Sequence, residues 1–472
     1  MILRVTCVNK VLGPVESVCP ECLNRLAGEL LRDGEVVRMV KRCPEHGEFS
    51  TVVWRGEPAF SSWVRPKIPF GGGIREEGGQ GCPYDCGLCA RHAQRTCTAL
   101  VEITSRCNLR CPVCFADSGG TGADPDMATL GRMFDQTMAR TGGCNLQLSG
   151  GEPTVRADLP EIVRRAKRAG FGFVQLNTNG LRLAEDPALA ENLVKAGLSS
   201  IFLQFDGVRD KVFRTMRGRD LFEVKKKAIE HASLAGLGIV LVPTVARGVN
   251  VDQLWDIVRF GLERQPHVRG VHFQPMSYFG RYPEDFIPDH VTLPEIMTGL
   301  EVQSGGAVKA PDFLPPGCEH ALCSFSGKFM TREDGGFVRL GSAACDCTPK
   351  PAETGALKSI GVTARQWSAP LAPALHPSSP PFTGQGAEPL AGCGAAPRIC
   401  STPDNDLDRF LARAKTHSFT ISAMAFQDAW SLNLERLQGC CIHVAQPDGR
   451  LIPFCAFNLT SRNGRSLYRG RE

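Results

Sequence analysis

The sequence lacks long apolar runs and blocks of like charge. No stretch of the 472 residues approaches the roughly eighteen consecutive apolar residues that a membrane-spanning helix needs. The amino-terminal segment, Met1–Cys7, has no apolar core of a secretion signal. Basic and acidic residues number 54 and 49 and are interspersed, so nucleic acid is not an expected partner. We therefore expect a cytoplasmic, soluble protein whose 42% hydrophobic residues suffice for a buried core.

The glycine-rich stretch at 66–80 lacks the context of a phosphate-binding loop. Such a loop needs a strand before its glycines and a helix after them, and neither pattern flanks Gly71–Gly73 or Gly78–Gly79. A flexible connector explains this composition better. We expect residues 66–98 to form a linker that also carries a cluster-binding loop.

Cysteine, in contrast, is abundant, with 21 residues. Disulfides are rare in a reducing cytoplasm, so cysteines at short spacing there are more often metal ligands or catalytic thiols. Cys7 and Cys144 stand alone in the sequence and are expected to be small buried hydrophobic residues. The other cysteines fall into groups that predict metal sites.

Residues 1–65 predict a small, rubredoxin-like metal-binding domain. Two pairs of ligands have the same internal spacing and lie about twenty residues apart: Cys19 and Cys22, then Cys43 and His46. Three thiolates and one imidazole form a closed tetrahedral site. Zinc and a single iron both suit sulfur-rich tetrahedral sites, so the ligands leave the metal open. Apolar runs predict two short strands, at Glu35–Met39 and Phe49–Trp54.

A second kind of cysteine group follows a strand-like run, Leu100–Thr104. Cys107, Cys111 and Cys114 bring three thiolates to the point where the strand gives way to a loop. A [4Fe–4S] cluster takes four thiolates, so a loop with three leaves one iron free for a ligand from a substrate or cofactor. The loop therefore predicts a reactive cluster.

The same spacing occurs 25 residues earlier, at Cys82, Cys86 and Cys89. No strand precedes this group, and Cys97 is a candidate fourth ligand, which suits a closed, electron-relaying auxiliary cluster. The alternative is that His92 completes this cluster and Cys97 belongs elsewhere.

Residues 99–300 alternate apolar strand-like runs with amphipathic helical segments. Six βα units predict an α/β fold, a partial (β/α)6 barrel with its site at the carboxyl ends of the strands. The expected strands are Leu100–Thr104, Asn145–Leu148, Gly172–Asn177, Ser200–Phe205, Gly238–Pro243 and Gly270–Phe273.

Beyond the barrel, a segment at 301–347 and a carboxyl-terminal region at 404–472 contain further cysteines. They predict another auxiliary iron–sulfur cluster with ligands from Cys318, Cys323, Cys440, Cys441 and Cys455. A hairpin turn at Gln446–Arg450 would bring Cys441 and Cys455 close together. The ten prolines between Thr348 and Pro403 predict a linker at 348–403. Four cysteines have no clear assignment: Cys345, Cys347, Cys393 and Cys400.

The cysteine loop, together with Ser149–Pro153, resembles the radical S-adenosylmethionine (radical SAM) superfamily. The resemblance implies that the free iron of the cluster chelates S-adenosylmethionine, whose cleavage gives a 5′-deoxyadenosyl radical that abstracts hydrogen from an unactivated carbon. It implies that Glu152 holds the methionine amino group and that Thr178, Gln204 and Asp206 contact the ribose or carboxylate. The implied cofactor-binding set is Cys107, Cys111, Cys114, Gly150, Gly151, Glu152, Thr178, Gln204 and Asp206.

Four further stretches are similar to one subfamily: Gly81–Cys89, Cys97–Thr104, Arg106–Ala116, and Cys440–His443 with Pro453–Cys455. This subfamily contains the archaeal tetraether lipid synthases and 7,8-dihydro-6-hydroxymethylpterin methyltransferases. The resemblance implies lipid C–C coupling, with transient contact to a membrane surface, or methylation of a pterin. It also implies one or two auxiliary clusters and a reductant such as ferredoxin or flavodoxin. Peptide modification is a further alternative, and a non-catalytic electron carrier is the alternative from another class.

Overall fold

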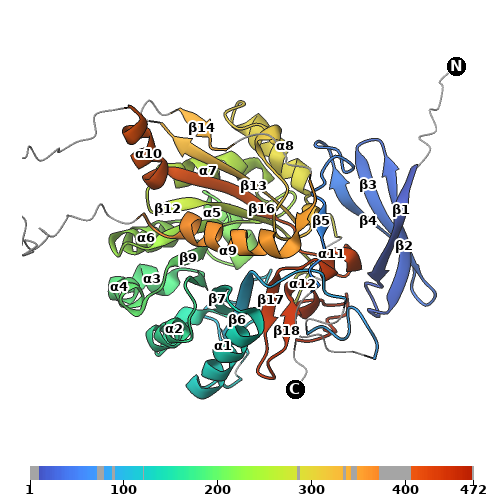
Figure 1. Cartoon of the computed structure of the whole chain (residues 1–472), viewed down its shortest axis with the longest axis horizontal. Coiled ribbons are helices and arrows are strands. Elements are labelled where there is room, and N and C mark those ends of the chain that lie inside the picture. Colours follow the sequence, from blue (N-terminus) through green and yellow to red (C-terminus); the bar gives the residue numbers. More distant parts are fainter. Residues whose placement is uncertain are drawn as a thin grey trace, which may run out of the picture.

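The computed structural model describes residues 10–71, 79–87, 91–120, 122–283, 288–332, 336–341, 348–370 and 406–469. Six cysteines lie outside the described residues: Cys7, Cys89, Cys345, Cys347, Cys393 and Cys400. A four-stranded amino-terminal sheet packs beside a much larger, mostly parallel sheet (Figure 1).

The amino-terminal sheet is antiparallel, with its strands in sequence order: β1 (Lys10–Val18), β2 (Arg25–Asp33), β3 (Val36–Cys43) and β4 (Gly47–Arg55). The two predicted strands, now β3 and β4, are confirmed. The sequence prediction missed β1 because Gly13 and Pro14 interrupt its apolar residues, and it missed β2 because only Leu26 of that strand is buried. Both sharp turns of this sheet use glycine with positive φ, Gly34 between β2 and β3 and Gly47 at the start of β4.

The large sheet contains all six predicted barrel strands as parallel neighbours in sequence order: β6 (Thr98–Thr104), β7 (Asn145–Gly150), β8 (Val174–Thr178), β9 (Ser200–Gln204), β10 (Gly238–Val242) and β12 (Val268–Pro275). A two-residue strand, β11 (Thr244–Val245), pairs beside β12. These strands are apolar because parallel strands are buried on both faces. The predicted partial (β/α)6 barrel is confirmed.

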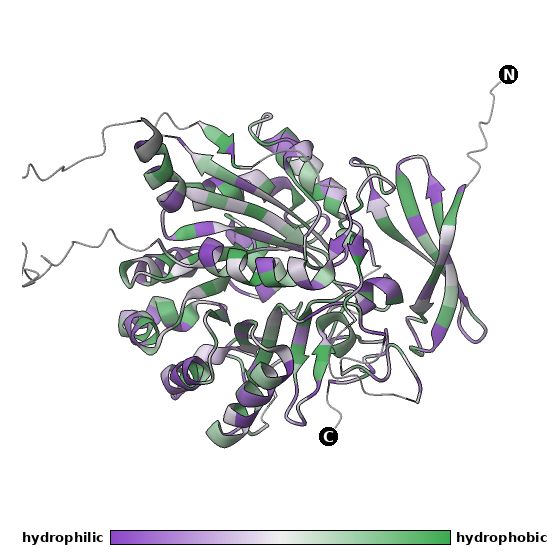
Figure 2. Cartoon of the chain, viewed as in Figure 1, coloured by the Kyte–Doolittle hydropathy of each residue, from purple (hydrophilic) through white to green (hydrophobic). Residues whose placement is uncertain are grey.

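Helices cover the outer face of this barrel (Figure 1). They are α1 (Met127–Thr141), α2 (Leu159–Arg168), α3 (Leu181–Glu185), α4 (Pro187–Ala196), α5 (Asp210–Arg217), α6 (Phe222–Leu234), α7 (Leu254–Leu262) and α8 (Leu293–Gln303). Strands of the large sheet are mostly hydrophobic, and hydrophilic residues gather on the outer sides of the helices (Figure 2). Within the described ranges, no helix has both the length and the hydropathy needed to cross a bilayer.

The last part of the chain extends the barrel sheet at both edges. Beside β12, the strand β16 (Ser418–Met424) pairs in parallel, followed outward by the antiparallel strands β13 (Ser324–Thr331) and β14 (Phe337–Arg339). Beside β6, the strand β17 (Ile442–Ala445) pairs in parallel and β18 (Leu451–Pro453) closes the predicted hairpin. Three short helices flank these strands: α10 (Asp406–Thr416), α11 (Leu434–Gln438) and α12 (Phe454–Phe457).

The prediction of a linker at 348–403 is wrong for its first part. Residues Lys350–Pro351 form β15, which pairs with β5 (Lys67–Ile68), and Ala352–Trp367 form the helix α9. All ten prolines lie outside this helix, so a composition averaged over the whole segment concealed it. The helix packs at the amino ends of the barrel strands, where a Cβ on Gly238 would lie 2.1 Å from the carbonyl oxygen of Trp367. It therefore closes the floor of the barrel.

Candidate active site

The predicted cluster loop lies at the carboxyl end of β6, against the Gly150–Glu152 turn that follows β7. The backbone N–H of Gly151 donates to the Thr104 carbonyl at 2.8 Å, and that of Glu152 to the Arg106 carbonyl at 2.9 Å. A Cβ on Gly150 would lie 2.1 Å from the Thr104 carbonyl oxygen, and a Cβ on Gly151 would lie 2.1 Å from the Arg106 carbonyl oxygen. The two glycines are therefore required because only a bare backbone can pack this closely.

Arg281 holds the cluster loop from its other side. Its backbone exchanges two hydrogen bonds with Cys114, at 2.9 and 3.0 Å, and its guanidinium donates to the carbonyls of Cys111 and Ser118. All three cysteines of the loop line one cavity. Burial raises the pKa of Cys107 to about 11 and also raises that of Cys111. A bound metal cation is what would favour the thiolate form there.

Glu152 is nearly fully buried at the cavity wall, and four donors fix its carboxylate. One oxygen, Oε1, accepts from the Thr178 hydroxyl at 2.7 Å and from the hydroxyl and N–H of Thr154. The other oxygen, Oε2, accepts from the Asn179 N–H at 2.6 Å. Since Oε2 has a single protein donor, it retains capacity for an amino group in the cavity. Thr178 also lines the cavity and orients Glu152.

Asp206 does not occupy the position that the sequence suggested. It is fully buried behind the cavity wall, and its two oxygens accept from the Arg217 guanidinium at 2.7 Å each. The group that faces the cavity there is Arg217, which also donates to the Val113 carbonyl inside the cluster loop at 3.0 Å. Gln204 lines the cavity beside this guanidinium. The sequence analysis missed Arg217 because it belongs to no motif.

The cavity has a volume of about 420 Å³ and extends through the interior of the barrel. Amide side chains are frequent on its wall: Gln147, Gln175, Asn177, Gln204 and Gln274. The Asn177 Oδ1 atom is buried and has no hydrogen-bond partner. His272 bonds through Nδ1 to the Ser422 hydroxyl at 2.9 Å, and burial lowers its pKa to about 4. It is therefore neutral near pH 7.

Three further cysteines line the same cavity at the opposite end of the barrel. The sulfur atoms of Cys97, Cys318 and Cys441 all lie within 4.8 Å of one another. Cys97 and Cys441 directly precede the neighbouring strands β6 and β17, and Cys318 lies shortly before β13. Hydrogen bonds from the other two thiols hold the pKa of Cys97 well below its usual value. We call these three residues the floor thiols.

The floor thiols correct the predicted assignment of Cys97. Cys97 lies with Cys318 and Cys441, and it does not complete the group of Cys82 and Cys86 as first expected. Of that first group, Cys82 and Cys86 come together, since a hydrogen bond from Cys86 lowers the pKa of Cys82.

The alternative ligand, His92, is engaged elsewhere. Its Nε2 bonds the carbonyl of Cys440 at 2.9 Å and lies 3.2 Å from Nε2 of His443.

The predicted carboxyl-terminal cluster splits into two thiol groups. Cys318 and Cys441 belong to the floor thiols, whereas Cys323, Cys440 and Cys455 neighbour one another outside the cavity wall. Burial, with a contribution from Cys323, raises the pKa of Cys455 to about 12. The hairpin of β17 and β18 does form, but it does not bring Cys441 and Cys455 into one group.

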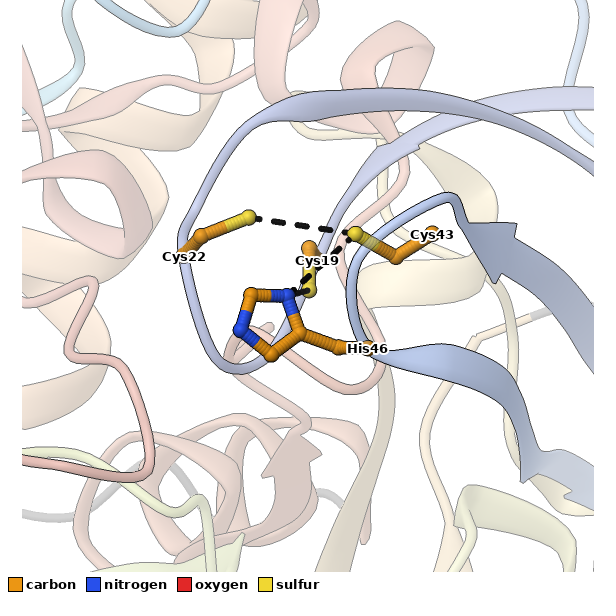
Figure 3. Close-up of side chains that lie close together, drawn as sticks. All are labelled: Cys19, Cys22, Cys43 and His46. Atoms are coloured by element: carbon orange, nitrogen blue, oxygen red, sulfur yellow. Dashed lines mark hydrogen bonds between the residues drawn. The ribbon is translucent and has the colours of Figure 1, made fainter.

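The amino-terminal ligands form the predicted group (Figure 3). The turn between β1 and β2 carries Cys19 and Cys22, Cys43 ends β3, and the turn between β3 and β4 carries His46. The His46 Nδ1 atom lies 3.4 Å from the sulfur of Cys43, and the sulfurs of Cys22 and Cys43 lie 4.0 Å apart. The hydrogen bond to His46 lowers the pKa of Cys43 to about 7. These separations suit a tetrahedral metal ion.

Comparison with known proteins agrees with this description. Residues 101–261 match the model of the radical SAM superfamily, and residues 11–55 match an HMPTM N-terminal zinc ribbon domain. With the barrel, the cysteine loop and the Gly-Gly-Glu turn, the first match defines the class: this is a radical SAM enzyme.

A more specific relationship comes from a curated relative from Methanocaldococcus jannaschii, 7,8-dihydro-6-hydroxymethylpterin dimethyltransferase. It is 34% identical, over 94% of this chain and 93% of its own length. The chain belongs to the family of that protein.

More distant similarities cover part of the chain. A probable GTP 3′,8-cyclase of Methanothermobacter marburgensis is 33% identical over 36% of this chain and 55% of its own length. Among solved structures, Streptococcus suis SuiB matches with a TM-score of 0.38 and 17% identity, covering 46% of this chain and 48% of that chain.

Proposed function

We propose that the enzyme transfers one-carbon groups to a pterin or a closely related polar heterocycle. The observation that supports this substrate best is the row of amide side chains on the cavity wall, with the unpartnered Oδ1 of Asn177 among them. A fused heterocycle with ring N–H groups can donate to Asn177 Oδ1, whereas an acyl chain would leave this buried atom unpaired at a cost of roughly 1–3 kcal/mol. The name of the M. jannaschii relative supports the same substrate class.

The residues at the carboxyl end of β6 fit the radical SAM cofactors. Cys107, Cys111 and Cys114 would hold a [4Fe–4S] cluster, and the free acceptor capacity of Glu152 Oε2 suits the amino group of S-adenosylmethionine. When bound, these groups supply the 5′-deoxyadenosyl radical that abstracts hydrogen.

Other parts of the protein adjust the charge around the cluster loop and keep water out of the cavity. Arg217 offsets the negative charge of the cluster loop, because its guanidinium lies close to the thiols of Cys111 and Cys114. The barrel wall and the helix α9 surround the cavity and limit the access of water to a reactive radical. We further propose that a ferredoxin or flavodoxin supplies the electrons and that the amino-terminal site of Cys19, Cys22, Cys43 and His46 binds zinc.

The experiment compares substrates directly. Anaerobically reconstituted enzyme with dithionite and S-adenosylmethionine is incubated with 7,8-dihydro-6-hydroxymethylpterin or with a deuterated lipid extract. Mass spectrometry should detect a methylated pterin and no deuterium in 5′-deoxyadenosine. Deuterium transferred from the lipid, without methylated pterin, would instead identify lipid C–C coupling at a membrane surface.

Asn177→Ala tests the observation on which the substrate proposal depends. The variant should raise the KM for the pterin about tenfold, a typical effect of one lost buried hydrogen bond, while uncoupled cleavage of S-adenosylmethionine stays unchanged. Ser359→Ala, at a cavity-lining residue on α9, is the matched control. An unchanged KM in Asn177→Ala would remove the support that the amide wall gives to this substrate.

A further inference from the structure

The floor thiols offer three ligands, and the metal centres that cysteine builds take four. The apolar residues that pack against the three sulfurs are Ala356 and Ile360 on α9 and Ile442 on β17. These side chains provide no fourth donor atom. A fourth ligand can come from a bound small molecule or from a polar side chain that reaches the floor thiols.

Glu319 is such a residue. It follows Cys318 directly and lines the cavity, and its Oε2 atom lies 3.8 Å from the sulfur of Cys441. Its other oxygen, Oε1, accepts from the hydroxyl of Ser324 at 2.5 Å, which fixes the orientation of the carboxylate. The hydrogen-bonding arrangement thus presents one carboxylate oxygen to the floor thiols.

Lys67 holds the backbone of the loop that carries Glu319. Its Nζ donates to the backbone carbonyls of Cys318 and Glu319, and its charge also acts on the Glu319 carboxylate. Gln94 also donates to the Cys318 carbonyl. These contacts fix the loop while leaving Oε2 turned toward Cys441.

We propose that Glu319 is the fourth, oxygen ligand of an iron–sulfur cluster held by Cys97, Cys318 and Cys441. Glu319 and the three cysteines all line the cavity, so such a centre would border the substrate space. The inference rests on the iron-dependent part of the proposed function and is independent of the identity of the substrate.

The test uses the full chain reconstituted with ⁵⁷Fe and sulfide, in a Cys107→Ala/Cys111→Ala/Cys114→Ala background that removes the radical cluster. Mössbauer spectra are recorded with Glu319 and with Glu319→Cys. An oxygen-bound iron should give a separate doublet of higher isomer shift, one quarter of the iron of that cluster, which disappears in Glu319→Cys. Because other clusters contribute equally to both spectra, the difference spectrum isolates the iron next to residue 319.

Two controls separate ligation from general damage. Glu353→Gln changes a half-exposed carboxylate on α9 that pairs with Arg95, and it should leave the separate doublet intact. Ser324→Ala removes the hydrogen bond to Glu319 Oε1 without removing a ligand. In this variant the doublet of the oxygen-bound iron should shift while the iron content stays unchanged. Zinc bound in the amino-terminal site reports that each variant is folded.

Identical spectra with Glu319 and Glu319→Cys, at equal iron content, would overturn the proposal. So would iron content that does not fall in Cys318→Ala, since the floor thiols would then bind no cluster. A separate doublet in an enzyme that never methylates a pterin would support Glu319 as a ligand and reject the proposed substrate alone.

Discussion

The amino-terminal ligand group and the floor thiols use the same sulfur donors, but the chain assembles them differently. Cys19 and His46, at the two ends of the first group, are 27 residues apart and belong to turns of one small sheet. Cys97 and Cys441 are 344 residues apart and meet because β17 joins the edge of β6. The first group is local in sequence, and the second depends on the completed barrel.

The two groups also differ in what surrounds them. The His46 side chain is 35% exposed, and none of the four amino-terminal ligands lines the cavity. The floor thiols are buried and form part of the cavity wall. A closed site remote from the cavity stabilises a fold, whereas a site on the cavity wall can act on what the cavity contains.

The largest expected effect on activity comes from a cysteine that lines the cavity. Cys107→Ala should reduce 5′-deoxyadenosine formation to background, because two thiolates do not retain a reactive cluster. Liquid chromatography of the nucleoside products measures this. Cys144→Ala, which changes a buried cysteine outside the ligand groups, should retain most activity. Full activity in Cys107→Ala would mean that another cysteine group cleaves S-adenosylmethionine.

Loss of the amino-terminal metal should mainly affect stability. Structural zinc contributes on the order of 10 kcal/mol to the folding of such sites, so Cys43→Ala should release the metal and make residues 10–55 sensitive to protease. Limited proteolysis and metal analysis check the result, and 5′-deoxyadenosine formation should fall less than about tenfold. Complete loss of cleavage with unchanged iron content would show that this site also takes part in the reaction.

Arg217→Met should have an intermediate effect, confined to the cavity. Removing a cation beside Cys111 and Cys114 disfavours the reduced, more negative cluster, so its reduction potential should fall and turnover should slow about 10–100-fold. Redox titration followed by electron paramagnetic resonance measures the potential. Arg217→Lys retains the positive charge, so its reduction potential should lie close to that of the unchanged protein. Equal potentials in the unchanged protein, Arg217→Met and Arg217→Lys would contradict the role assigned to Arg217.

The smallest expected effect concerns the junction between the two regions. Lys41 of β3 donates to Ser17 and to the carbonyls of Ala429 and Trp430, and burial lowers its pKa to about 7. At pH values between this pKa and the ordinary pKa of lysine, Lys41 is protonated in the unfolded chain and neutral in the folded protein. The free energy of unfolding should therefore rise with pH, by about 1.4 kcal/mol per unit.

Denaturant unfolding from pH 7 to 9.5 measures this slope. Lys41→Met removes the titrating group and should lack this contribution. The same slope in both proteins would assign the pH dependence to other groups.

The sequence predicted what is local or strongly patterned. The six barrel strands are continuous apolar runs, and the cluster loop with Gly151 and Glu152 is a compact motif, so both could be located without a structure. The amino-terminal ligands were predictable for the same reason, since their spacing alone brings them together.

The grouping of the other cysteines could not be predicted, because it depends on strand order. No periodicity indicates that β17 pairs with β6, and this pairing is what places Cys97 beside Cys441. Cys440 and Cys441 are adjacent, yet they belong to different groups, as expected where extended backbone directs successive side chains to opposite sides. Spacing gives the number of candidate ligands but not their partners.

The pairing of β16 and β17 with opposite edges of the barrel has a consequence for biosynthesis. The ribosome releases all six βα units, and the complete radical SAM loop, before it makes Cys441. The nascent barrel therefore has two open edges and an unfinished floor until the last strands are added, and contacts this distant in sequence form slowly. The floor thiols therefore come together only after the chain has been made beyond Cys441, so any metal that they bind is acquired late in biosynthesis.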